Sequence, residues 1–246
     1  MSQSRHNHST SASIDRTYLF ASGTFKNVYE GQYIEGRRAG ERCVAKEFKE
    51  SSPYEEKYFE EEMKIIRTSQ KIIDDWHDAG IVRNHILLNI PEIWVYRGRR
   101  RDAFSLVEPM INNYEKFNSN SGWVNRSTGD WGELMQALSH FSFHNSDGKL
   151  LLCDLQGGVY QDGYILSDPV IMSKDNGKYG PTDLGIDGIR LFFEKHRCTR
   201  FCRAEWRTPR HTSQGTIRVR QGTSMVRPRE LPARGSRRVI RGIRIR

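Results

Sequence analysis

The chain lacks any long apolar run, and this absence argues against a membrane-spanning helix. No stretch of about 18 consecutive apolar residues occurs among its 246 residues. Residues 1–15 are polar, rich in Ser and His and without an apolar core, so they predict no secretory signal. Cysteine is scarce as well. Four residues without regular spacing argue against a disulfide framework and for a reducing compartment, cytoplasmic or nuclear.

Acidic side chains are almost missing from the C-terminal segment. Residues 207–246 contain twelve arginines, no lysine and one glutamate, about +11 in charge. Because the whole chain carries +9, residues 1–206 carry about −2. The segment also has few large apolar residues, which predicts a basic disordered tail with at most weak affinity for polyanions. Aromatic residues do not alternate with the arginines, so a dedicated nucleic-acid site is the less favoured interpretation.

Residues 16–206 contain the pattern of a globular α+β body, between a disordered N-terminus (1–15) and the basic tail (207–246). Strand patterns with glycine turns come first. A long amphipathic helix from Pro53 to Asp78 interrupts them, with an apolar face. Helices near 131–143 and 187–195 follow a further set of strands. Strands with one helix, then a helix-richer half, predict a two-lobed α+β fold. The expected apolar face of the long helix consists of Phe59, Met63, Ile66, Ile73 and Trp76.

Two aspartates and a glutamine form the most informative polar pattern. Asp154 and Gln156 flank one leucine at the end of an apolar strand, residues 149–155. Strand alternation sends both side chains to the same side. With Asp168, they offer carboxylate and amide oxygens suited to Mg²⁺ and to orienting a hydroxyl nucleophile. For either aspartate alone an Asx turn is the simpler interpretation, but the pair with Gln156 favours a magnesium–phosphate site.

A lysine could complete such a site. Lys46 ends a Val-Ala-Lys strand between a glycine-containing turn and the long helix. A lysine in this position can contact nucleotide phosphates, with a helix carboxylate, Glu62 or Glu61, holding it in place. Taken alone, the same pattern is more simply explained by a solvated lysine at a strand end.

Three potential zinc ligands lie within seven residues. His196, Cys198 and Cys202 form the spacing H-x-C-x3-C, and the two cysteines would share one helical turn. A tetrahedral zinc site needs one more ligand, whereas the alternative is a pair of ordinary buried thiols. The candidates for the fourth ligand are His140, His144, His211, Cys43 and Cys153.

Several short motifs occur in a fixed order, and as a set they resemble the alpha-kinases, a family of atypical serine/threonine protein kinases. The resemblance covers roughly Tyr18 to Trp206. Its motifs are Phe-Ala-Ser-Gly-Thr-Phe-Lys (20–26), Val-Ala-Lys (44–46), Val-Glu-Pro-Met (107–110), Lys-Phe-Asn-Ser-Asn (116–120), Ser-His-Phe-Ser-Phe (139–143), Cys-Asp-Leu-Gln-Gly (153–157), Ser-Asp-Pro (167–169), Gly-Pro-Thr-Asp-Leu-Gly (180–185) and the H-x-C-x3-C.

The resemblance implies a two-lobed, atypical protein-kinase-like fold and transfer of the γ-phosphoryl group of Mg-ATP to Ser or Thr of a protein substrate. It implies that Lys46 contacts the ATP phosphates. It also implies that Glu108 and Met110 form the hinge that holds adenine through backbone groups. Lys116 and Asn120 would lie beside the ribose and phosphates.

The resemblance further implies the catalytic and metal-binding residues. Asp154 would be the catalytic aspartate, with Gln156 and Asp168 holding Mg²⁺. A structural zinc site in the C-terminal lobe would use His140 as fourth ligand beside the H-x-C-x3-C residues. The glycine loop 177–185 would help to receive the peptide substrate. Lys26 departs from the arginine that the family often has at its position.

Two other interpretations stay open at this level. A catalytically inactive kinase-like module that binds ATP or protein would keep the fold, although all the expected polar positions are present. A zinc-stabilised nucleic-acid-binding protein would use the arginine tail, and the nearly neutral body argues against it. Neither the physiological substrate nor the oligomeric state follows from the sequence.

Overall fold

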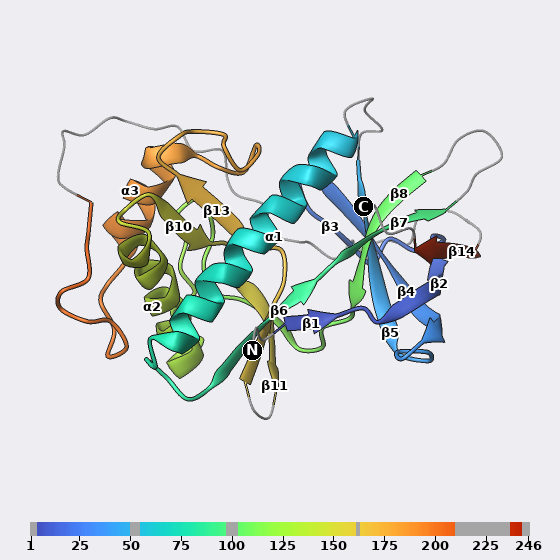
Figure 1. Cartoon of the computed structure of the whole chain (residues 1–246), viewed down its shortest axis with the longest axis horizontal. Helices are drawn as coiled ribbons and strands as arrows, with labels where there is room; N and C mark the ends of the chain where they lie inside the picture. Colours follow the sequence, from blue (N-terminus) through green and yellow to red (C-terminus); the bar gives the residue numbers. More distant parts are fainter. Residues whose placement is uncertain (1–3, 50–54, 97–102, 161–162, 210–236, 243–246) are drawn as a thin grey trace. The chain divides into compact units, whose positions relative to one another are not determined.

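The computed structural model describes residues 4–49, 55–96, 103–160, 163–209 and 237–242. They combine helices with many strands, which confirms the expected α+β class (Figure 1). The chain divides into two compact units, which are described separately. Unit 1 comprises Met1–Ser4, Glu60–Leu88 and Ile111–Gly222, and unit 2 comprises Arg5–Phe59, Asn89–Met110 and Thr223–Arg246.

Unit 2 is built on an antiparallel sheet that closes on itself. Its strands are hydrogen-bonded in the order β2-β14-β7-β8-β5-β4-β3, and β2 also pairs with β4. Strands β4 and β5 form a hairpin, in which they pair from Lys26↔Phe48 to Gln32↔Arg42. The strands are β2 (Ser9–Asp15), β3 (Ala21–Ser22), β4 (Lys26–Gly36), β5 (Arg42–Phe48), β7 (Glu92–Tyr96), β8 (Ala103–Pro109) and β14 (Arg237–Gly242).

Strand alternation divides β5 between two environments. Cys43 and Ala45 are completely buried in an apolar cluster with Tyr33 and Trp94. Val44 and Lys46 are directed to the opposite face. There Val44 belongs to a second cluster with Ala21, Val28 and Met110. The sheet therefore has a closed apolar interior and a separate face that carries Lys46.

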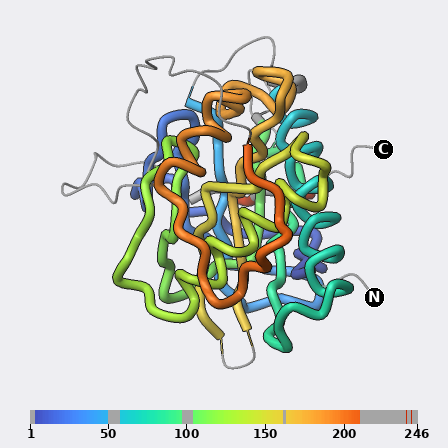
Figure 2. The backbone as a smooth tube through the Cα atoms, turned by 90° about the vertical axis from the view of Figure 1, so that its left-hand side faces the viewer, coloured from blue at the N-terminus to red at the C-terminus, as the bar shows by residue number. Residues whose placement is uncertain are grey.

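Unit 1 combines two whole helices and most of a third, α1, with two small sheets. In one sheet β6, β12, β11 and β9 are neighbours in that order, and β10 pairs with β13 in the other. Figure 2 shows the segment after α3, in orange, on the side of unit 1 that faces the viewer. The helices are α1 (Glu55–Asp78), α2 (Gly129–Asn145) and α3 (Gly185–Lys195), and the strands are β6 (His85–Ile90), β9 (Tyr114–Lys116), β10 (Leu150–Cys153), β11 (Gln156–Tyr160), β12 (Gly163–Leu166) and β13 (Val170–Ser173).

The helices occur where the apolar periodicity predicts them. Four of the five residues expected on the apolar face of α1 are buried, and Met63 is half-buried. Helices α2 and α3 each begin two residues before the expected start. Both start at a glycine with left-handed backbone, Gly129 (φ +54°) and Gly185 (φ +68°). Glycine is the residue that tolerates this conformation best. Because glycine also disfavours helix, the sequence pattern placed each helix start after it.

Two segments that we expected to be disordered contribute strands. Residues 1–15 contain β1 (Ser4–His6) and β2, in which Ala12 and Ile14 are completely buried. In β2 these two apolar residues alternate with Ser and Asp, which is the pattern of a half-buried strand. The pattern is weak because alanine has a small side chain and a low strand propensity. Within the tail, β14 pairs with both β2 and β7, while residues 210–236 lie outside the described part. No helix in the described ranges has the length and apolarity needed to cross a membrane.

We expect Gly242→Val to weaken the attachment of β14. A Cβ atom at this position would lie 2.9 Å from Nε1 of Trp94, whose indole is 1% exposed and donates to Glu92 at 3.1 Å. An overpacked contact of this kind typically lowers the free energy of unfolding by about 1–3 kcal/mol. Thermal unfolding should show the loss, whereas the matched change Val239→Thr at an exposed position should have little effect. Equal melting temperatures for both variants would contradict this role of β14.

Candidate functional site

The acidic turn of unit 1 follows the buried strand β10. Asp154 leaves that strand with left-handed backbone (φ +57°), and Gln156 begins β11 directly opposite Lys116 of β9. Lys116 Nζ lies 2.8 Å from Asp154 Oδ1, and Gln156 Nε2 donates to Asp154 Oδ2 at 3.0 Å. The expectation that Asp154 and Gln156 share one side is confirmed by this contact, and Lys116 joins them.

Asp168 lies close to the same turn. Its carbonyl oxygen accepts a hydrogen bond from Gln156 Nε2 at 3.5 Å, and Ser167 N donates to Gln156 O at 3.0 Å. Asp168 also has left-handed backbone, with φ +48°. Aspartate is one of the few residues besides glycine that adopt this region, and such backbone outliers cluster at functional sites. Both aspartates are therefore held in unusual conformations within one small region.

The pKa of Asp154 reflects opposing influences. Burial, with 4% of the residue exposed, raises the pKa of this carboxyl group. The charge and hydrogen bond of Lys116 lower it, the negative charge of Asp168 raises it, and a backbone hydrogen bond from Asn120 lowers it. The net effect is a raised pKa, because burial outweighs the lowering by Lys116 and the backbone donor. A buried carboxyl group with a perturbed pKa and a specific charged partner is a candidate functional group.

Asn118 holds the acidic turn through hydrogen bonds of its side chain, a role that the sequence pattern did not predict. It is completely buried, and its Oδ1 accepts the N–H of Leu155 at 2.9 Å. Its Nδ2 donates to Ser139 Oγ of α2 at 3.1 Å. The residue between Asp154 and Gln156 is therefore tied to a helix. Asn120 lies on the same loop, and its Nδ2 donates to Thr182 O at 3.3 Å.

A buried carboxylate organises the glycine loop 177–185, which the sequence pattern marked only by its glycines. Asp183 is 2% exposed. Its Oδ1 accepts from the N–H groups of Ser173 and Gly185, and its Oδ2 accepts from Ser173 Oγ and Tyr179 N, over 2.7–3.2 Å. Four donors on one carboxylate fix the loop, whose glycines Gly177, Gly180 and Gly185 all have left-handed backbone.

Unit 2 carries a buried ion pair. Lys46 Nζ lies 2.7 Å from Glu108 Oε1, with side-chain exposures of 5% and 4%. The register explains the contact, since Val44 is opposite Glu108 and Lys46 is therefore diagonal to it on the same face. The structure thus gives Lys46 a strand carboxylate as a partner, and the pairing with a helix carboxylate, Glu62 or Glu61, stays a prediction. Met110 follows, its N–H donating to Arg42 O at 3.1 Å.

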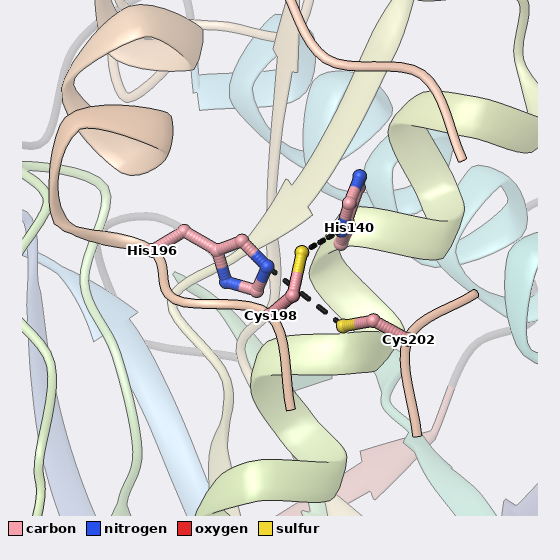
Figure 3. A group of neighbouring side chains, drawn as sticks. All are labelled: His140, His196, Cys198 and Cys202. Carbon is pink, nitrogen blue, oxygen red and sulfur yellow. Dashed lines mark hydrogen bonds between the residues drawn. The ribbon is translucent and has the colours of Figure 1, made fainter. Parts of the chain in front are cut away.

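Four potential metal ligands converge at a second site in unit 1 (Figure 3). His140 comes from α2, whereas the others follow α3. Ligand atoms from all four residues lie within 4.8 Å of one another. Cys198 Sγ is 3.8 Å from His140 Nδ1, and Cys202 Sγ is 3.8 Å from His196 Nε2. The four residues are His140, His196, Cys198 and Cys202.

One expectation about this cluster is wrong. Cys198 and Cys202 do not share a helical turn, because α3 ends at Lys195 and His196 has extended backbone. A turn closed by the hydrogen bond from Cys202 N to Thr199 O, 3.0 Å long, brings the thiols together instead. Of the other candidates for the fourth ligand, Cys43 belongs to unit 2 and His211 lies outside the described residues.

The donor set fits zinc. Bonds of about 2.3 Å to sulfur and 2.0 Å to nitrogen, meeting at the tetrahedral angle, place sulfur and nitrogen about 3.5 Å apart, near the observed spacing. His140 Nε2 donates to Arg207 O at 2.9 Å, which leaves Nδ1 as the lone-pair nitrogen facing Cys198. Burial lowers the pKa of His140 and lowers that of His196 to about 4, which favours the neutral form of imidazole that a zinc ligand requires.

Trp206 packs beside the cluster of four potential ligands. It is 6% exposed and contacts Trp76 of α1 and three rings of α2, those of His140, Phe141 and His144. The segment that carries the two cysteines is therefore packed onto both helices by an aromatic anchor.

Comparison with known proteins gives a consistent result. A family model described as the alpha-kinase family matches residues 21–202. Alpha-protein kinase 1 of Dictyostelium discoideum is 30% identical over 189 residues, which cover 74% of this chain and 13% of that protein. Eukaryotic elongation factor 2 kinase of Mus musculus is 33% identical over 144 residues, which cover 58% of this chain and 19% of that protein. The chain thus spans less than a fifth of either relative.

Solved structures show the same fold. An alpha kinase from Entamoeba histolytica superposes with a TM-score of 0.66 at 22% identity, covering 87% of this chain and 84% of that chain. An inactive alpha-kinase domain of myosin-II heavy chain kinase A, complexed with ATP, gives a TM-score of 0.64 at 19% identity. That match covers 78% of this chain and 86% of the other.

Proposed function

The chain belongs to the alpha-kinase family, and from this premise we propose that it is a serine/threonine protein kinase that transfers the γ-phosphoryl group of Mg-ATP to a protein hydroxyl. The observation that carries the proposal is the group formed by Lys116, Asp154 and Gln156, beside Asp168. It places a cation, a buried carboxylate and a polar amide in contact. Phosphoryl transfer needs mainly positioning and charge stabilisation, and these are the groups that supply both.

Asp154 would orient the acceptor hydroxyl and accept its proton. Its carboxyl group follows the end of the buried strand β10, and the ammonium group of Lys116 lowers its pKa against the larger effect of burial. Gln156 donates to Asp154 through Nε2, which leaves Oε1 available to a cation. Gln156 and Asp168 would hold Mg²⁺, which when bound neutralises charge on the phosphates.

Unit 2 supplies the groups suited to the nucleotide. The ammonium group of Lys46, paired with Glu108, would contact the phosphates. The apolar cluster of Ala21, Val28, Val44 and Met110 lies on the same sheet face and suits a purine. Lys116 and Asn120 would lie beside the ribose and phosphates, as the family resemblance implies.

The zinc site would have a structural role. Its four protein ligands leave no open coordination position for chemistry. A zinc ion held there would tie α2 to the segment after α3. The loop fixed by Asp183 would receive the peptide substrate.

We expect the purified chain, incubated with Mg²⁺ and γ-labelled ATP, to transfer label to a generic basic protein. Phosphoamino acid analysis should recover the label as phosphoserine or phosphothreonine, because Asp154 acts on a hydroxyl. Label found only as free phosphate would indicate an ATPase. Binding of ATP without any transfer would favour an inactive kinase-like module instead.

A further inference from the structure

The family model begins at residue 21, yet a segment ahead of it makes specific contacts with the end of β8. Asn7 is completely buried, and its Nδ2 donates to Val107 O at 2.7 Å. Arg5 Nη1 donates to Met110 O at 3.0 Å and to Pro109 O at 3.4 Å. All of these residues belong to unit 2.

These contacts give hydrogen-bond donors to backbone carbonyl groups at the end of β8. The pairing of β8 with β7 ends at Glu92↔Val107, and its pairing with β5 ends at Cys43↔Pro109. Carbonyl groups at a strand end need partners from elsewhere. A third side chain takes part, because Asn89 is completely buried and its Nδ2 donates to Pro109 O at 2.8 Å. Arg5 Nη1 also lies 3.5 Å from Asn89 Oδ1.

The N-terminal segment is itself anchored. Asn7 Oδ1 accepts the hydroxyl hydrogen of Tyr33, which is 1% exposed in the core of the sheet. Arg38 Nε donates to His6 O at 2.8 Å, and Arg37 N donates to His8 O at 2.8 Å. His8 has left-handed backbone (φ +50°), which redirects the chain between β1 and β2. The segment is therefore anchored to the sheet, and it can in turn hold the end of β8 in place.

We propose that Arg5 and Asn7 are positioning residues for nucleotide binding, acting through the β8 end that they hold. Glu108, whose side chain contacts Lys46, lies between two of the restrained carbonyl groups, and Met110 carries the third. The inference rests on the proposed function, in which Lys46, paired with Glu108, contacts the phosphates and the apolar cluster that includes Met110 receives the purine. Neither Arg5 nor Asn7 belongs to the acidic turn, so their loss should affect nucleotide affinity and leave the chemical step nearly unchanged.

The test compares Arg5→Met, Arg5→Lys and Asn7→Ser with the wild type. The control is Arg37→Met, a change at an exposed arginine of the same unit. Each protein is assayed for the Kd of Mg-ATP by calorimetry, for KM and kcat with a model peptide, and for melting temperature. We expect Arg5→Met and Asn7→Ser to raise Kd and KM for ATP about three- to tenfold, the effect of losing one or two hydrogen bonds. The value of kcat should change less than twofold, and Arg5→Lys should recover part of the affinity.

Other outcomes separate this inference from the proposed function. If the wild type transfers phosphate but the variants keep its Kd and KM, the positioning role is overturned alone. A uniform loss of kcat, affinity and melting temperature would reduce Arg5 and Asn7 to a general structural role, which also contradicts the inference. If the wild type binds ATP without transfer, the proposed function fails and the Kd values still decide the role of Arg5 and Asn7. A wild type that does not bind ATP contradicts both.

Discussion

Asp154→Asn should lower the rate of phosphoryl transfer at least about 10²-fold while the protein stays folded. The amide keeps the size of the carboxylate but cannot accept the hydroxyl proton, and it loses the charge that pairs with Lys116. Asparagine also tolerates the left-handed backbone of this position (φ +57°), so the change should add little strain. Initial rates with saturating Mg-ATP, together with circular dichroism spectra, measure both parts of this expectation.

The chain offers a closely matched control for this change. Asp147 also has left-handed backbone (φ +55°) and belongs to unit 1, but it is exposed and pairs with Arg207 on the surface. Asp147→Asn should therefore keep nearly full activity. Asp168→Asn should lose activity as Asp154→Asn does. Substantial transfer by a folded Asp154→Asn protein would remove this residue from the catalytic role.

Cys202→Ser should abolish zinc binding and destabilise unit 1. The purified wild type should contain about one zinc per chain by elemental analysis. The apparent binding free energy of a structural zinc site is about 10–16 kcal/mol, as large as the whole stability of a typical domain, about 5–15 kcal/mol. We therefore expect the variant to aggregate or to melt far below the wild type.

A second cysteine separates metal loss from the loss of a thiol. Cys153 is 1% exposed in unit 1 but packs with Phe143, Leu151 and Met172, and it is not one of the four candidate zinc ligands. Cys153→Ala should keep the zinc content of the wild type. The contrary result would be a wild type that contains no zinc and whose Cys198 and Cys202 both react freely with a thiol reagent. It would show that the two cysteines are ordinary free thiols.

Features that depend on local periodicity could be predicted from the sequence. Helix α1 forms where its apolar face predicts it. The contact between Asp154 and Gln156 was also expected, but from strand alternation, whereas Asp154 lies after the end of β10 with left-handed backbone. The contact of Lys46 with Glu108 could not be predicted, because it depends on the register that places Val44 opposite Glu108. The four hydrogen bonds of Asp183 likewise join residues that only the folded loop brings together.

The N-terminal segment shows a different limit of sequence patterns. Arg5 and Asn7 stand in a polar stretch without apolar periodicity, so composition predicts disorder there. Their fixed positions come from carbonyl groups about a hundred residues later in the chain. The tight turn at Cys198 and Cys202 was missed for a similar reason, since a spacing of four residues fits a helix as well as the turn that forms.

Parallel measurement of Mg-ATP binding and of phosphate transfer, on the wild type and on Asp154→Asn, tests the central claim most directly. Our account predicts that both proteins bind Mg-ATP and that only the wild type transfers the γ-phosphoryl group to serine or threonine of a protein. A wild type that binds Mg-ATP and transfers no phosphate, like its variant, would contradict the account.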